Sequence, residues 1–309
     1  MEKDERFRGV GVAIVTPFKD DESIDEAALA RLVDWHVDQG TDFLVPCGTT
    51  GENPALSHDE HLRVIEIVVK RANGRVPVLA GAGSNSTTKA VDFAIASLDR
   101  GADGILTITP YYNKPTPDGL LRHFSAQAEA LEKVKTGFPM ILYNVPGRTG
   151  TNMTAATTLR IAREIPNVIG VKEASANLDQ IMTILRERDP GFLVVSGEDS
   201  WTLPMIALGA DGVISVAANE IPGLMKQMVS AALSGDFRKA RDVHERILPL
   251  MEGNFIESNP GPVKTAMKMM NLIENDLLRA PLAPMSDANR TRLREILAQC
   301  ELLPASRGA

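Results

Sequence analysis

The sequence predicts a (β/α)8 TIM barrel with a C-terminal helical extension. Three observations support this fold class: eight short apolar segments, amphipathic segments between them, and a junction that recurs three times. The apolar segments are rich in Val, Ile and Leu, which is typical of strands buried on both faces of a parallel sheet. Eight such units most simply close into a barrel. The predicted strands span residues 10–18, 43–48, 76–83, 104–110, 139–144, 167–172, 192–197 and 212–217.

The amphipathic segments between these strands carry signals for the start and the end of helices. "SIDE" at 23–26 and "SHDE" at 57–60 match the capping-box pattern, in which a serine and a glutamate three residues later bond to each other's backbone. Gly40, Gly101 and Gly209 stand where three of the helices should end. We therefore expect helices that begin at these boxes and stop at these glycines.

The recurring junction reads "QGTDFLVPCG", "RGADGILTITP" and "LGADGVISVA". Each copy places a glycine, a small residue and an aspartate before a strand, which favours repeated βα units. Similar loop chemistry without a shared unit is the alternative, because Gly and Asp are common in loops. An open doubly wound sheet is less consistent with the sequence, because "GAGSNS" at 81–86 holds only the first two glycines of the dinucleotide fingerprint.

The C-terminal part of the chain continues without strand patterns. Residues 220–302 show helical patterns, of which the first is the last barrel helix and the rest form the extension. We predict a catalytic barrel over residues 1–235 and a helical region over residues 236–309 that packs on it. No low-complexity linker separates the two parts.

Composition argues against several classes of protein. A net charge of −7 does not suit a nucleic-acid or anionic membrane surface. The two cysteines lie far apart in the sequence and form neither a disulfide framework nor a zinc pattern. No segment approaches the ~18 apolar residues of a membrane span, and the N-terminus lacks the apolar core of a signal peptide. We therefore expect a cytoplasmic protein with no membrane or nucleic-acid partner.

Polar side chains collect at the ends of the predicted strands, where TIM barrels carry their reactive groups. The three tyrosines of the chain all belong to this set. Such a concentration favours a catalytic site over a set of unrelated surface residues. The main members are Thr16, Thr49, Thr50, Tyr111, Tyr112, Tyr143, Arg148 and Lys172.

Lys172 ends the apolar segment "NVIGVK" with no polar residue before it. Burial at a barrel mouth would lower its pKa, by up to ~3–5 units if burial is complete. A neutral amine attacks carbonyl carbon and forms a Schiff base. A lysine that extends to solvent or pairs with Glu173 is the alternative. The tyrosines favour chemistry, because imine formation needs proton transfer and Tyr143 is a candidate for it.

Two further features suit the binding of carboxylates. The "GTTG" turn at 48–51 offers hydroxyls and consecutive backbone N–H groups that can form an anion-binding nest. Arg148 can grip a carboxylate with its planar fork. Each is a weak signal alone, because Gly-Thr turns are common and a single arginine usually lies on the surface. Only His58 and His61 lie close together among the five histidines, with no third ligand, so no metal site is expected.

Four motifs together resemble one known family. "GTTGE", "TPYYNKP", "YNVPGRTG" and "GVKEAS" occur in the order found in the pyruvate-dependent class I aldolase and lyase family. The resemblance runs from about Gly9 to about Leu272. It implies that Lys172 condenses with pyruvate to a covalent imine and that the enzyme needs no metal or organic cofactor. "SNPGPVK" at 258–264 departs from the family by having Gly261 in place of an aliphatic residue.

The resemblance also implies roles for the other residues of the site. The amides and hydroxyls of Thr49 and Thr50 hold the pyruvate carboxylate, and Tyr143 serves as general acid and base. Thr49 and Tyr112 complete a proton relay with Tyr143. Gly197 and Ile214 match positions whose carbonyls face the substrate.

Arg148 points to one branch of this family. In the branch that joins pyruvate to aspartate semialdehyde, in lysine (diaminopimelate) biosynthesis, this arginine holds the carboxylate of the aldehyde, and the sialic-acid lyases lack it. A related aldolase acting on a sugar-derived 2-oxo acid is the alternative. A silent barrel that only binds a 2-oxo acid is a third hypothesis, and it predicts a missing lysine or tyrosine.

The family also implies a homo-oligomer, most often a tetramer built as a dimer of dimers. In it, Tyr112 reaches across a dimer interface into the neighbour's site. Regulated members bind lysine at this interface, and the matching residues here include Asn53, Pro54, His58, His61, Asn85, Lys89 and Tyr111. Those members have a glutamate at the position of Lys89. Two ammonium groups repel each other, so we expect inhibition by lysine to be weak or absent.

Overall fold

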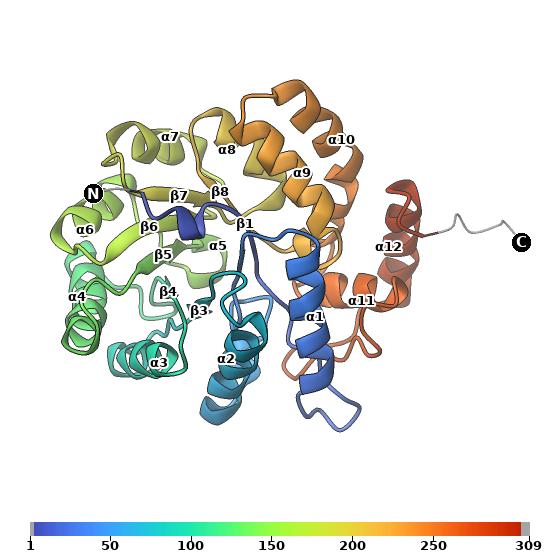
Figure 1. Cartoon of the computed structure of the whole chain (residues 1–309), viewed down its shortest axis with the longest axis horizontal. Coiled ribbons are helices and arrows are strands. Elements are labelled where there is room, and N and C mark those ends of the chain that lie inside the picture. The colour runs from blue at the N-terminus through green and yellow to red at the C-terminus, as the bar shows by residue number, and fades with distance from the viewer. Residues whose placement is uncertain (1–2, 304–309) are drawn as a thin grey trace, which may run out of the picture.

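The computed structural model describes residues 3–303 and has the predicted architecture, a (β/α)8 barrel with C-terminal helices (Figure 1). All eight strands run parallel, in the order β2-β1-β8-β7-β6-β5-β4-β3. A single parallel bridge between Leu44 and Val78 joins the two ends of the sheet. The strands are β1 (Gly9–Val12), β2 (Phe43–Leu44), β3 (Leu79–Gly81), β4 (Gly104–Ile108), β5 (Met140–Asn144), β6 (Val168–Glu173), β7 (Leu193–Ser196) and β8 (Gly212–Ser215).

Helices follow the strands and surround them. They are α1 (Glu26–Asp38), α2 (His58–Ala72), α3 (Thr87–Asp99), α4 (Pro117–Val134), the short α5 (Pro146–Thr149), α6 (Ala155–Glu164), α7 (Leu178–Glu187), α8 (Thr202–Ala207) and α9 (Pro222–Leu233). Single 3-10 turns lie at Glu5–Phe7, Asn53–Ala55, Asp199–Trp201 and Ala217–Asn219. Within residues 3–303, no helix combines the length and the apolar character needed to cross a membrane.

Most of the predicted helix boundaries are confirmed. Gly40, Gly101 and Gly209 follow the ends of α1, α3 and α8, each with a positive φ that glycine adopts without strain. The capping box of Ser57 at the start of α2 is present in both directions.

The capping box expected at residues 23–26 is wrong. Ser23 lies in the turn before α1, where its amide and hydroxyl both bond to Asp21. Asp25 caps α1 instead, because its carboxylate accepts from the amide of Ala28 at 2.9 Å. An aspartate adjacent to the helix fills this role as well as a serine does.

The barrel has a core on each side of its strands. Inside, one cluster of side chains from the strands, among them Phe43, Leu79, Leu193 and Ile214, fills the space around the axis. Outside, two larger clusters pack the strands against the helices. Tyr143, near the carboxyl end of β5, also belongs to this inner cluster, so the core extends to the mouth of the barrel where polar residues are expected.

The extension consists of α10 (Phe237–Gly253), α11 (Gly261–Met269) and α12 (Asp287–Gln299), and it stands at one side of the barrel beside α1 and α9 (Figure 1). The predicted boundary at residue 235 falls in the turn between α9 and α10. Side chains from all three helices, such as Leu250, Val263 and Leu293, belong to the same apolar cluster as the strands β1 and β2. The apolar core therefore runs without a break from the barrel into the extension, which packs on the barrel.

Candidate active site

Lys172 and Tyr143 face each other on neighbouring strands. The pairing of β5 with β6 places Tyr143 opposite Lys172, after a register shift between Met140 and Ile141 that leaves Ile169 unpaired. Such an irregularity turns the following residues of a strand to the other face. Ile169 and Lys172 are thereby both on the inside of the barrel, and the Lys172 Nζ lies 4.4 Å from the centroid of the Tyr143 ring.

The environment of Lys172 favours its neutral form. The residue is 6% exposed, and burial lowers the pKa of its ammonium group to about 8, against the opposing effect of Asp199 and Glu198. The positive charge of Arg148 lowers the pKa further. A lysine with this pKa is a nucleophile near neutral pH, as the sequence predicts for a Schiff-base residue.

The phenol of Tyr143 is kept in its protonated form. Burial raises the pKa of its phenol above the ordinary value, so the hydroxyl stays protonated at neutral pH. The charge of Arg148 and the nearby Thr49 side chain act in the opposite direction on this pKa. Thr49 and Tyr143 line the same cavity, which is the arrangement that a proton relay needs.

The turn that carries Thr49 and Thr50 presents free amides. Gly51 and Glu52 donate their N–H groups to the carbonyls of Gly48 and Thr49, at 3.1 Å each, and so close the turn. Among the described residues, no acceptor takes the N–H of Thr49 or of Thr50. Two consecutive free amides beside a cavity form the kind of nest that binds a carboxylate.

A small enclosed cavity of about 70 Å³ brings these groups together. Its walls include Thr49, Thr50, Tyr143, Arg148, Lys172 and Gly197. Gly197 leaves room for the lysine, because a Cβ there would lie 3.0 Å from the Lys172 Cε and 2.7 Å from the Ala174 Cβ. Six of the eight residues predicted for catalysis and substrate binding therefore line one cavity.

The other two predicted residues, Ile214 and Tyr112, do not line this cavity. Ile214 on β8 is buried in the inner cluster and does not line the cavity. Tyr112 is 89% exposed and has a φ of +74°, in the left-handed region that a tyrosine rarely adopts. An exposed aromatic ring on a strained backbone is available to another molecule, not to the cavity of its own chain.

The structure adds residues that sequence reasoning did not identify. Glu198 lines the cavity, and burial together with the neighbouring Asp199 raises the pKa of its carboxyl to about 7. Phe255 and Asn259 reach the cavity from the segment between α10 and α11. Asn259 donates its amide to the Thr50 hydroxyl oxygen at 3.0 Å. Glu198 lies in the polar segment "SGEDS" at 196–200, and Asn259 lies in "SNPGPVK" at 258–264, but no spacing rule connects either segment with Lys172.

A larger cavity of about 450 Å³ lies beside the catalytic one and shares Gly48, Thr49, Leu106, Tyr143 and Arg148 with it. It contains five of the candidate effector residues, namely Asn53, Pro54, Asn85, Lys89 and Tyr111.

Phe93 also lines the larger cavity. The rings of His58 and His61, the other two candidate effector residues, lie 5.3 and 4.3 Å from the Phe93 ring. His61 also contacts the Asn53 side chain and the Gly81 carbonyl, and burial lowers the pKa of its ring to about 4. No group of three His, Cys, Asp or Glu side chains within residues 3–303 is arranged to hold a metal ion.

Comparison with known proteins gives concordant matches. The model of the dihydrodipicolinate synthetase family matches residues 6–300. A 4-hydroxy-tetrahydrodipicolinate synthase of Koribacter versatilis (strain Ellin345) is 51% identical over 300 residues, which cover 96% of this chain and 97% of that protein. The dihydrodipicolinate synthase of Aquifex aeolicus has a crystal structure that superposes with a TM-score of 0.92 at 46% identity, covering 96% and 99% of the two chains. A structure described as the first monomeric dihydrodipicolinate synthase variant also has a TM-score of 0.92, at 40% identity, with 96% and 98% covered.

Proposed function

This chain belongs to the dihydrodipicolinate synthetase family, and on that premise we propose that it joins pyruvate to L-aspartate 4-semialdehyde through a Schiff base on Lys172 and releases 4-hydroxy-tetrahydrodipicolinate. The observation that carries the mechanism is the pair of Lys172 and Tyr143 on adjacent strands, in one cavity with two free amides. The silent-barrel hypothesis predicts a missing lysine or tyrosine, and this chain has both.

The reaction begins with the carboxylate of pyruvate at the amides of Thr49 and Thr50. The neutral amine of Lys172 then attacks the carbonyl carbon, and the carbinolamine loses water to give an imine. Tyr143 supplies the proton that converts the departing hydroxyl to water, and the hydroxyl of Thr49 passes protons to and from it. The protonated imine acts as the electron sink, so the mechanism calls for no metal or organic cofactor.

Carbon–carbon bond formation follows from the imine. Loss of a proton from the methyl group gives an enamine, whose carbon attacks the aldehyde carbon of the second substrate. The aldehyde oxygen takes up a proton and becomes the 4-hydroxyl group. The amino group of the second substrate then attacks the imine carbon, closes the ring and displaces the amine of Lys172, which returns to its starting state.

A product assay tests the function directly. Purified protein, pyruvate and L-aspartate 4-semialdehyde are incubated together, and the product is consumed by a reductase that oxidises NADPH. We expect turnover that depends on both substrates. No turnover with this aldehyde, together with cleavage of a sugar-derived 2-oxo acid, would assign the chain to the alternative branch.

Arg148 is proposed to select the second substrate. It lies on the short helix after β5, makes up part of the cavity wall, and acts electrostatically on both Lys172 and Tyr143. Arg148→Lys keeps the charge and removes the bidentate fork. We expect a rise of KM for aspartate semialdehyde of about tenfold or more, with little change for pyruvate. Equal changes of both KM values would instead indicate a structural role.

Tyr112 is proposed to act in the site of a neighbouring subunit, which makes the active unit at least a dimer and, as the family implies, a tetramer. Its exposure and its strained backbone support this role. Mixing Lys172→Met and Tyr112→Phe subunits tests it, because a hybrid dimer holds one site with both residues intact. We expect the mixture to regain activity that neither variant has alone. No recovery after verified subunit exchange would contradict action across the interface.

Inhibition by lysine is proposed to be weak, because Lys89 lines the larger cavity where an ammonium ligand would need a carboxylate. Losing one charge-assisted bond costs about 1.5–3 kcal/mol, which is roughly a tenfold to hundredfold loss of affinity. Initial rates across millimolar L-lysine should stay nearly constant, and Lys89→Glu should become inhibited. Strong inhibition of the wild type at sub-millimolar lysine would show that another acid serves the ligand.

A further inference from the structure

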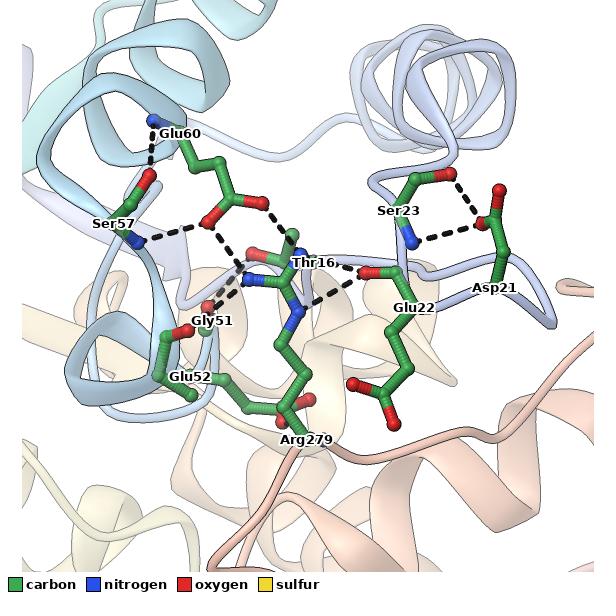
Figure 2. Close-up of polar contacts among 10 residues, drawn as sticks. Thr16, Asp21, Glu22, Ser23, Gly51, Glu52, Ser57, Glu60 and Arg279 are labelled. Carbon is green, nitrogen blue, oxygen red and sulfur yellow. Dashed lines mark hydrogen bonds and ion pairs between the residues drawn. The ribbon is translucent and has the colours of Figure 1, made fainter.

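The turn that offers its amides to pyruvate is anchored by more than its own hydrogen bonds. On the barrel side, the Thr16 hydroxyl donates to the Gly51 carbonyl at 2.7 Å, as Figure 2 shows. The next residue, Glu52, connects the turn with the C-terminal extension. Its φ of +55° lies in the left-handed region, so its backbone depends on surrounding contacts to keep this conformation.

Both carboxylate oxygens of Glu52 are held by the extension. The Oε1 accepts from the Lys264 Nζ on α11 at 2.6 Å, and the side chains of both residues are fully buried. The Oε2 accepts from the backbone amide of Arg279 at 3.0 Å. Lys264 also donates to the carbonyl of Leu277 at 2.8 Å, which satisfies a second of its protons. The buried charges are therefore paired and hydrogen-bonded, as burial requires.

The side chain of Arg279 extends the same connection to α2. Its guanidinium donates to both carboxylate oxygens of Glu60, at 2.8 and 2.6 Å, and to the carbonyl of Glu22 at 2.6 Å. Figure 2 shows the guanidinium between these two residues. The ring of Phe18 lies 4.2 Å from the Lys264 Nζ and 4.5 Å from the Arg279 Cζ. The segment around Glu52 is thus fixed against a rigid group of side chains.

The position of Glu52 also creates an electrostatic problem that Lys264 removes. Glu52 follows Thr50 by two residues, so its negative charge belongs to the same segment as the amides that receive the carboxylate of pyruvate. Two negative charges at short range in a buried site repel each other strongly. Lys264 neutralises Glu52 at 2.6 Å, and it does not itself line the catalytic cavity.

We propose that Lys264 is a positioning residue for pyruvate, which acts through Glu52 to hold the amides of Thr49 and Thr50 and to cancel the charge behind them. This inference rests on the proposed function and deepens it, because it makes the C-terminal extension part of substrate binding. Asn259, which bonds to the Thr50 hydroxyl, reaches the same turn from the same extension.

Lys264→Met tests the proposal, because methionine has a similar length and no charge. Trapping of Lys172 with borohydride is measured with pyruvate and with its methyl ester, which offers the same carbonyl group without the carboxylate. The wild type should prefer pyruvate over the ester. In the variant, we expect this preference to fall about tenfold, equivalent to about 1.4 kcal/mol, because only pyruvate uses the anchored amides.

Two more variants separate positioning from stability. Lys264→Met with Glu52→Gln removes both charges, so it leaves no unpaired buried carboxylate and should fold even if the single variant does not. Its preference for pyruvate should remain below that of the wild type, since the anchor is still missing. Arg188→Met is the matched control, because Arg188 pairs with the buried Asp211 just before β8, at the opposite end of the barrel. It should lower Tm and leave the preference unchanged.

The outcomes are distinct. A wild-type preference for pyruvate in both Lys264 variants would overturn the positioning role. An equal loss of preference in Arg188→Met would also overturn it, because it would show a general effect of stability. If the wild type itself failed to trap pyruvate at Lys172, the proposed function would fail instead, so the two failures can be told apart.

Discussion

Lys172→Met should reduce the rate of condensation by roughly 10³-fold, equivalent to about 4 kcal/mol of activation free energy. Methionine fills the space of the lysine but cannot form an imine, so the enamine needed for carbon–carbon bond formation is lost. Borohydride with pyruvate should add mass to the peptide that contains Lys172 in the wild type and to no peptide in the variant.

Lys264 is an internal control for this experiment. Burial also lowers the pKa of its ammonium group to about 8, but its amine is paired with Glu52 and lies outside the cavity wall. A label on Lys264, or retained labelling of the Lys172→Met variant, would contradict the assignment. A lowered pKa alone does not make a lysine reactive. Lys172 and Lys264 differ in their access to the cavity, and we expect only Lys172 to react.

The same reaction should depend on pH in a defined direction. Imine formation needs the neutral amine, so trapping should rise with pH and reach half of its maximum near the lowered pKa of about 8 for Lys172. At pH 7 this pKa leaves about one lysine in ten neutral, against roughly one in 2,500 at the ordinary pKa of about 10.4. A midpoint near 10 would show that the amine is not desolvated in solution.

Tyr143→Phe and Thr49→Val should each lower kcat by roughly 10²–10⁴-fold, the usual contribution of a positioned acid–base group. Each change removes one hydroxyl from the relay and keeps the shape of the side chain. The phenol is protonated at neutral pH because burial raises its pKa, so its loss removes the proton donor for imine formation.

The double variant gives the sharper measurement. If Tyr143 and Thr49 act as one relay, removing both hydroxyls should cost little more than removing one. Additive losses would show two independent roles. Wild-type kcat in both single variants would remove the relay from the mechanism. Thr151→Val is a suitable control, because Thr151 is buried, its hydroxyl donates to the Pro110 carbonyl at 3.1 Å, and it does not line the catalytic cavity.

Local patterns in the sequence were sufficient for the architecture. The eight apolar segments each overlap one strand of the barrel, because a strand buried on both faces needs a continuous apolar run. The Ser57 capping box and the three glycines act through hydrogen bonds and φ angles within a few residues, so their effect is readable locally. The capping box at residues 23–26 did not form, because Asp21 accepts the hydroxyl of Ser23 and Asp25 caps α1 instead.

The sequence by itself also determined most of the candidate site, because a parallel barrel brings the ends of its strands to one mouth. Tyr143 and Lys172 lie near the ends of neighbouring predicted strands, which was enough to expect them at the same mouth, whereas the register shift that turns Lys172 inward was not predicted. The tertiary structure alone decided the contacts of the extension, such as Lys264 with Glu52, which are 212 residues apart. It also decided the pKa of Glu198 and the orientation of Tyr112. The ion pair, the pKa and the exposure of the ring all depend on which segments, distant in the sequence, pack together and exclude water. Neither the periodicity of apolar residues nor the spacing within a motif carries that information.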